Sequence, residues 1–127
     1  MQRLALAVVA FGMMTGAALA DPVEGVWKTQ VDDGAYAHVT IAPCGARVCG
    51  VISRTFNSSG EYSSPNIGKR LVWDMQPKGK GAYRNGKIWQ PSKDKVYSSK
   101  MDMSGNTLKV KGCIGPICKK QTWSRVE

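Results

Sequence analysis

The feature that most restricts the fold is a succession of short strand-like segments with no helical period after residue 20. In the clearest segment, Ala35, Ala37, Val39 and Ile41 alternate with Tyr36, His38 and Thr40, which is the period of a half-buried strand. Further strands are predicted at residues 25–30, 48–55, 70–75, 83–84, 88–89, 96–103, 108–114 and 118–126. Sequential short strands are typical of a sandwich or an up-and-down antiparallel barrel. The sequence therefore predicts a small all-β domain of eight or nine strands.

Turn signals separate these segments. Asp32-Asp33-Gly34 predicts a hairpin, and Asn85-Gly86 between strand residues is the strongest short-range hairpin signal in the chain. Residues 76–81 are predicted as a basic turn, and Pro43 is expected to end the second strand. Residues 57–68 are rich in glycine, serine and proline, which predicts a long loop of a kind that is often functional.

The first twenty residues have the order of signals found in a secretory signal peptide. Arg3 supplies the positive region, residues 4–14 are almost purely apolar, and Ala18-Leu19-Ala20 is a small-x-small cleavage site before Asp21. A buried core helix is the alternative. We expect cleavage between Ala20 and Asp21 and a periplasmic or secreted domain of residues 21–127. The apolar run is too short to span a membrane, and nucleic acid is an improbable partner for an exported protein.

Four cysteines, Cys44, Cys49, Cys113 and Cys118, form two pairs with identical spacing. An exported chain meets an oxidising compartment, so disulfides are favoured. Three connectivities are possible, and we favour Cys44–Cys49 and Cys113–Cys118, each across a short hairpin, because directly opposed strand residues have suitable spacing. A zinc site with four cysteine ligands is the alternative.

Charge and size limit the candidate partners. The chain of 127 residues has 18 basic and 9 acidic side chains, and without Arg3 the count is 17 against 9, a net charge of +8. Such a surface favours solubility, and it also suits an anionic envelope component such as lipopolysaccharide, cell-wall polymer or phospholipid. A domain of this size is expected to build a core but not to enclose a large cavity as well.

A further pattern joins the two ends of the domain. It consists of Gly25-x-Trp27 near the start and Arg125 near the end. An arginine stacks well on an indole, and glycine permits close approach of a neighbouring backbone. This pair of motifs resembles the calycins, the lipocalin-like small barrels, in which the guanidinium lies across the tryptophan and closes the bottom of the barrel. The resemblance implies that Gly25, Trp27 and Arg125 close the barrel, and it favours a barrel over a sandwich.

A longer pattern covers nearly all of residues 21–127: Asp21-Pro22, Gly25, Trp27, Pro43-Cys44-Gly45, Cys49-Gly50, Gly86-Lys87-Ile88, Pro91, Tyr97, Lys100-Met101, Leu108, Val110, Gly112-Cys113 and Gln121 to Arg125. It resembles the DUF2147 family of exported bacterial proteins. The family usually shows Tyr-Asp-Pro-x-x-Gly-Lys-x-Tyr, whereas this chain has Trp89-Gln90-Pro91 followed by Ser92-Lys93-Asp94-Lys95. The resemblance implies an exported calycin-like barrel. It brings no established activity, catalytic residue or cofactor.

The residues offer little for catalysis. His38 is the only histidine, no Gly-x-Ser-x-Gly motif is present, and most carboxylates fall at turns or termini. A metal site on His38 would need further ligands with suitable spacing. We therefore predict no catalytic residues, no metal site and no cofactor.

The aromatic residues favour binding. Most should fill the core, and some are expected to line a barrel mouth. The candidate ligand-binding residues are Tyr36, His38, Trp73, Trp89 and Tyr97. Two hypotheses follow: a non-catalytic binding module for a small or lipid-like ligand, or a basic structural protein that contacts anionic envelope polymers, lipids or a protein partner.

Overall fold

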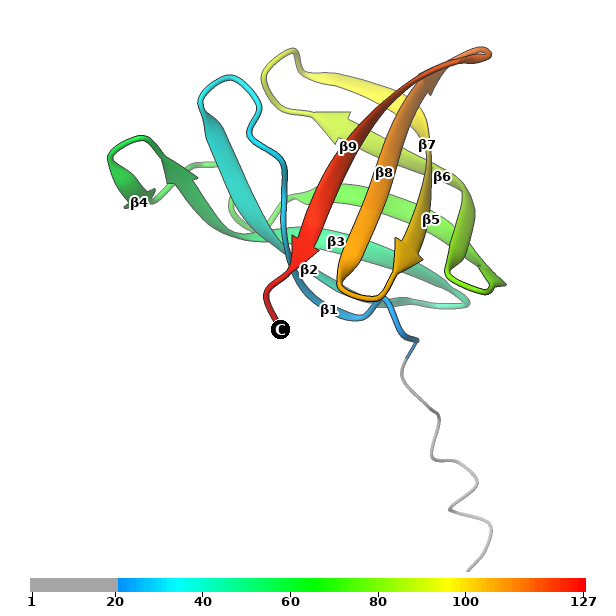
Figure 1. The fold of residues 1–127 in the computed structure, drawn as a ribbon. Coiled ribbons are helices and arrows are strands. Elements are labelled where there is room, and N and C mark those ends of the chain that lie inside the picture. The colour runs from blue at the N-terminus through cyan, green and yellow to red at the C-terminus, as the bar shows by residue number, and fades with distance from the viewer. Residues whose placement is uncertain (1–20) are drawn as a thin grey trace, which may run out of the picture.

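A computed structural model describes residues 21–127, so the predicted signal peptide and most of its cleavage site lie outside the described residues. The described part is all β (Figure 1). Its nine strands are β1 (Gly25–Lys28), β2 (Ala35–Cys44), β3 (Arg47–Asn57), β4 (Gly60–Tyr62), β5 (Arg70–Gly79), β6 (Ala82–Gln90), β7 (Lys95–Ser104), β8 (Thr107–Ile114) and β9 (Ile117–Arg125). Among these residues no helix is long and apolar enough to cross a membrane.

Eight of the strands close into an up-and-down antiparallel barrel. Around the ring the order is β1-β2-β3-β5-β6-β7-β8-β9, and β9 pairs with β1 to complete it. The short strand β4 pairs only with β3 and stands away from the ring (Figure 1). The predicted all-β barrel is therefore confirmed, with β4 as an additional strand inside the segment predicted as a loop.

The core fills one end of the barrel. Along β2, Ala37, Val39 and Ile41 point inward, as their alternation predicts. They meet large buried side chains from every part of the chain, among them Trp27, Met75, Met101, Leu108 and Trp123. The end that holds these residues also holds the start of the described chain, at Asp21, and the C-terminus (Figure 1), and we call it the closed end.

Arg125 and Trp27 meet at the closed end. They are directly opposite each other on β9 and β1, and the guanidinium carbon lies 4.3 Å from the centroid of the indole ring. Arg125 also donates to the carbonyl oxygens of Glu24 (3.1 Å) and Pro22 (2.8 Å). A Cβ at Gly25 would lie 2.9 Å from Arg125 Nη1, so glycine leaves the space that the arginine occupies. The geometry is the one that the calycin-like motif implies.

The segment before β1 plugs the same end. Val23 is fully buried, and its carbonyl accepts a hydrogen bond from the indole nitrogen of Trp27. The hydroxyl of buried Tyr83 donates to the carboxylate of Asp21. Burial and this hydrogen bond raise the pKa of Tyr83 well above its ordinary value.

We expect Tyr83→Phe to lower the free energy of unfolding by about 1.5 kcal/mol at pH 7, because it removes a buried hydrogen bond to a charged group. A raised tyrosine pKa means that the unfolded state releases the proton first, so this group stabilises the fold below pH about 10 and loses that effect above it. As the pH rises above that value, the free energy of unfolding should therefore fall less for Tyr83→Phe than for wild type. Urea unfolding at pH 7 and at alkaline pH measures both effects.

Tyr97→Phe is the matched control, because its hydroxyl donates over 3.2 Å to the neutral side chain of Gln90 in a half-buried position. We expect a loss of about 0.5 kcal/mol at pH 7. Equal losses for the two variants would contradict the role assigned to the Asp21 contact.

Several predicted boundaries are wrong. Asn85-Gly86 is not a turn but lies inside β6, where the register with β7 shifts and Asn85 has a φ of 63°. The turn that joins β5 to β6 is Lys80-Gly81, with φ values of 56° and 81°, and β5 extends through most of the predicted basic turn. Strand β2 continues past Pro43 to Cys44. The Asp33-Gly34 turn is present where the sequence predicts it.

Both favoured disulfides are present, Cys44–Cys49 and Cys113–Cys118. Cys113 and Cys118 are directly opposed on β8 and β9. Cys49 instead lies opposite Ala42, so the first disulfide joins a diagonal pair rather than an opposed one. The Cys44–Cys49 bond fastens the β2–β3 hairpin at the closed end, and the Cys113–Cys118 bond fastens the β8–β9 hairpin at the other end.

Candidate functional site

The end of the barrel opposite the closed end is open and holds a cavity of about 600 Å³. This differs from the expectation that so small a domain would contain no large cavity. The interior positions that line it include small side chains, Ala37 and Gly112, and two threonines, Thr29 and Thr55. The core residues at the closed end are larger, so the same barrel is filled at one end and hollow at the other.

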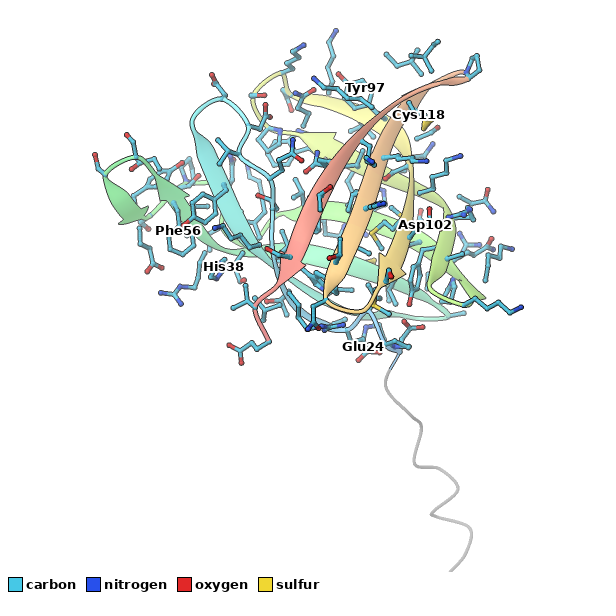
Figure 2. The ribbon with its side chains drawn as sticks, in the orientation of Figure 1. Glu24, His38, Phe56, Tyr97, Asp102 and Cys118 are labelled. Atoms are coloured by element: carbon cyan, nitrogen blue, oxygen red, sulfur yellow. A yellow bond between two sulfur atoms is a disulfide. The ribbon has the colours of Figure 1, made fainter. Side chains whose placement is uncertain are left out.

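Apolar and polar side chains line the cavity together. Ile52, Leu71, Ile88 and Tyr97 are among the apolar ones. Figure 2 shows Tyr97 near the open end and Glu24 at the opposite end. The Thr29 hydroxyl is held by the backbone, because it accepts a hydrogen bond from the Ala37 amide at 3.0 Å. Small-molecule sites usually combine apolar side chains with fixed polar groups.

Thr55, which is directly opposed to Ala37 on β3, is also held by backbone hydrogen bonds. The Thr55 hydroxyl donates to the Tyr62 carbonyl at 2.6 Å and accepts from the Ser64 amide at 3.3 Å. These two bonds fasten the segment after β4 to β3 at the mouth of the cavity. The loop predicted at residues 57–68 therefore forms part of the cavity wall, through Tyr62, Ser64 and Asn66.

Lys119 brings a positive charge to the mouth. It is directly opposite Gly112, and strand alternation from buried Trp123 through Gln121 places it on the inner face of β9. The ion pairs within residues 21–127 are Arg54–Glu61 and Arg84–Asp102, so no described carboxylate neutralises Lys119. An acidic group on a bound molecule would meet an unpaired ammonium there.

One acidic side chain at the mouth already accepts hydrogen bonds from neighbouring residues. Asp32 and Asp33 line the cavity from the β1–β2 loop. The Asp32 carboxylate accepts from Ser92 at 2.9 Å and from Gln90 at 3.4 Å, which joins that loop to the β6–β7 turn. The Asp32 carboxylate is therefore occupied by hydrogen bonds, whereas Lys119 takes part in no ion pair of the described residues.

Of the five predicted ligand-binding residues, His38 lies outside the cavity. Its ring centroid is 4.7 Å from that of Phe56 on the outer face of β2 and β3 (Figure 2). Desolvation, followed by the positive charge of Arg54, lowers the pKa of His38. His38, a candidate ligand-binding residue, therefore does not line this cavity, because the inward positions of β2 on either side of it are Ala37 and Val39.

Tyr36 belongs to the same outer cluster. Its ring stacks on Phe56 at 4.8 Å, with the Lys28 ammonium 4.7 Å from the ring centroid. Tyr36 is nevertheless one of the residues that line the cavity. The pairing of Tyr36 with Phe56 across β2 and β3 explains why the ring turns outward, since the two residues are directly opposed in the sheet.

The remaining three aromatic candidates also divide into residues outside the cavity and residues that line it. Trp73 does not line the cavity, and the Arg70 guanidinium lies 5.4 Å from its ring. Trp89 and Tyr97 do line the cavity. The indole nitrogen of Trp89 donates to Asp94 in the adjacent turn, and the Lys69 ammonium lies 5.5 Å from its ring.

The sequence analysis missed Lys119 and the two threonines. Counting back by twos from Trp123 would have placed Lys119 on the inner face, so the signal existed in the pattern. The same count forward from Trp27 within the predicted strand at residues 25–30 would have placed Thr29 on the inner face, where its hydroxyl accepts from the Ala37 amide.

The comparisons with known proteins agree with this geometry. The sequence model of a family described as "Uncharacterized protein conserved in bacteria (DUF2147)" matches residues 25–125. The chain belongs to the DUF2147 family. No curated protein matches the sequence. Among solved structures, HP1028 from Helicobacter pylori, described as belonging to the lipocalin family, superposes with a TM-score of 0.64 at 18% identity and 82% coverage of each chain.

For this DUF2147 member the structural similarity establishes a lipocalin-like fold and nothing about a ligand. Within residues 21–127 no group of three or more histidine, cysteine or acidic side chains is arranged to hold a metal. The hydroxyl of Ser99 is buried without a hydrogen-bond partner in the described structure. The residues that line the cavity can hold a molecule by apolar contact, by hydrogen bonds at the mouth and by the charge of Lys119.

Proposed function

We propose that the protein is a non-catalytic binding module for a small or lipid-like ligand that enters the open end of the barrel. The observation that carries the proposal is the cavity of about 600 Å³ at the mouth, which apolar and polar side chains line together. This volume lies within the range of roughly 300–1,000 Å³ that is typical of small-molecule sites. The lipocalin-like fold supports the same reading by analogy.

The lining favours an amphiphile with an apolar body and one acidic or polar group. The apolar part would pack on Ile52, Leu71 and Ile88, deep in the cavity. The acidic group would lie at the mouth beside Lys119, where it stays close to water and gains from an ammonium that has no described carboxylate partner. A wholly polar ligand would leave the apolar wall unused.

We also propose that the protein acts outside the cytoplasm and performs no chemical step. Two disulfides in one small domain are typical of an oxidising compartment, and the sequence before Asp21 resembles a signal peptide. The single histidine faces away from the cavity, which leaves the mouth without an evident general base.

Ala37→Phe tests the proposed site. Ala37 lies on the inner face of β2 and lines the cavity, so a phenyl ring would occupy the space that the ligand needs. We expect native mass spectrometry of the protein purified from the periplasm to show a polypeptide beginning at Asp21 with a retained small molecule. In Ala37→Phe the retained fraction should fall at least tenfold, since overlap with a filled volume removes the ligand's apolar contacts.

Ala42→Phe is the control, because it makes the same change on the same strand at an exposed outer position. It should retain the ligand like wild type. A clean apo mass for wild type, or equal retention in both variants, would contradict the cavity as the binding site. A mass that includes residues 1–20 would contradict export by cleavage before Asp21.

A further inference from the structure

The β8–β9 hairpin ends in an apolar tip that no described residue covers. Ile114 and Ile117 are directly opposed at the tip and are 70% and 74% exposed, more than any other large hydrophobic residue that the structure describes. Gly115-Pro116 forms the turn between them. Two adjacent exposed isoleucines at a projecting tip form a small apolar surface that is available to a partner.

The hairpin is also rigid and projects beyond the barrel. The Cys113–Cys118 disulfide joins its two strands directly behind the isoleucines. Figure 1 shows the tip of β8 and β9 extending past the neighbouring strands at the open end, and Figure 2 labels Cys118 at the start of this extension. A clamped tip loses little conformational entropy when it binds.

A row of lysines crosses the outer face just behind the tip. Lys100, Lys111 and Lys120 are directly opposed on β7, β8 and β9. Like charges in opposed positions destabilise a sheet, and none of the three lysines takes part in an ion pair of the described structure. Between Asp102 and Glu127 the sequence has no acidic residue. The row therefore forms a positive band without internal compensation.

The spacing between the tip and the lysines matches the interface of a lipid bilayer. Lys119 and Lys120 lie two and three residues beyond Ile117, on opposite faces of the strand, which places them about 7–10 Å behind the tip at roughly 3.3 Å per residue. Interfacial elements bury their apolar residues about 5–10 Å deep, with basic side chains at the level of the headgroups. Lysines near an anionic surface add attraction to the apolar contact.

We propose that the β8–β9 hairpin docks the open end of the barrel onto an anionic lipid bilayer, with Ile114 and Ile117 inserted between the headgroups and Lys111, Lys119 and Lys120 on their phosphates. The bilayer is favoured over a soluble polyanion because a polyanion would use the lysines and leave both isoleucines in water. Docking in this orientation brings the cavity mouth to the membrane surface. The docking surface borders the cavity, because Ile114, Ile117, Lys119 and Lys120 are among its lining residues, but docking does not require a ligand in the cavity.

The test is flotation of the purified protein with vesicles. We expect it to float with vesicles of phosphatidylcholine and phosphatidylglycerol, to float at least tenfold less with phosphatidylcholine alone, and to be released by high salt. Ile114→Ser/Ile117→Ser should weaken binding to the anionic vesicles on the order of tenfold, because the apolar contact is removed. Lys111→Gln/Lys120→Gln should weaken it by a similar factor.

Matched controls lie at the closed end of the barrel. Val126→Ser changes another exposed apolar residue, and Lys78→Gln/Lys80→Gln removes the same charge from exposed positions beside the β5–β6 turn. Neither control should change binding by more than about twofold, since surface changes away from the contact have small effects. Vesicle binding is compared only among variants whose thermal stability equals that of wild type, so that unfolding cannot account for a loss of binding.

Three results would overturn the proposal. The first is failure of the wild type to float with anionic vesicles, and the second is equal binding to neutral vesicles. The third is a loss in the lysine variant without a loss in the isoleucine variant, which would assign the hairpin to a soluble anionic polymer. Loss of vesicle binding with retained cavity ligand would leave the proposed function intact, so the two failures are distinguishable.

Discussion

Arg125→Ala should lower the free energy of unfolding by about 3 kcal/mol, the largest effect that we expect from one side chain at the closed end. The change removes a guanidinium packed at 4.3 Å on buried Trp27, and it leaves the carbonyl oxygens of Glu24 and Pro22 without their donor. A cation shielded from water over an indole contributes about 2 kcal/mol, and the lost hydrogen bonds add to it. Urea unfolding monitored by tryptophan fluorescence provides the measurement.

Arg70→Ala is the matched control. Arg70 also lies over a tryptophan, at 5.4 Å from Trp73, but it is exposed on the outer face of β5. We expect a loss of about 0.5 kcal/mol, because water screens the exposed pair. Arg125→Lys should fall between the two, since one ammonium cannot reproduce the planar fork that reaches both carbonyls. Equal losses at positions 125 and 70 would refute the closing role of Arg125.

Gly86→Ala should cost about 2–3 kcal/mol, although it adds a single methyl group. A Cβ at this position would lie 2.5 Å from the Sδ of Met75 and 2.8 Å from the carbonyl oxygen of Trp73. Met75 is fully buried and can move little, and the carbonyl belongs to the backbone of the neighbouring strand. The added atom therefore forces β5 and β6 apart inside the barrel wall.

Gly112→Ala is the comparison for this change. The added Cβ would meet a side-chain methyl of Ile88 at 3.3 Å and no backbone atom within 4 Å among its nearest contacts. We expect a loss below about 1 kcal/mol, because a side chain at the cavity wall can shift. Thermal unfolding of both variants ranks them, and a larger loss at position 112 would show that the space around Gly86 is not limiting.

The sequence predicts much of this barrel because its signals are local or lie at the chain ends. Alternation in β2 fixed which residues point inward, and the equal spacing of the cysteines identified both disulfides. The Gly25, Trp27 and Arg125 motif identified a contact between residues far apart in the chain. These features depend on residue type at fixed spacing, which a sequence displays directly.

Other features depend on neighbours that a single segment does not reveal. Asn85-Gly86 has the composition of a turn, yet its glycine serves close packing against Met75 inside a continuous strand. The cavity likewise arises from the sum of small residues on several strands, among them Ala37 and Gly112. Aromatic composition indicated a binding surface but not which face His38 and Trp73 occupy, because that depends on register.

The join between β1 and β9 has a consequence for the order of folding. Only two residue pairs form its register, Trp27 with Arg125 and Lys28 with Ser124, whereas β2 and β3 share ten. It also joins the two ends of the domain, where the bond from Arg125 to Glu24 spans 101 residues. Contacts of that separation carry the greatest loop-closure cost and form after local hairpins. Until the last residues of the chain are present, the protein is an open sheet with two exposed edges that other chains can pair with.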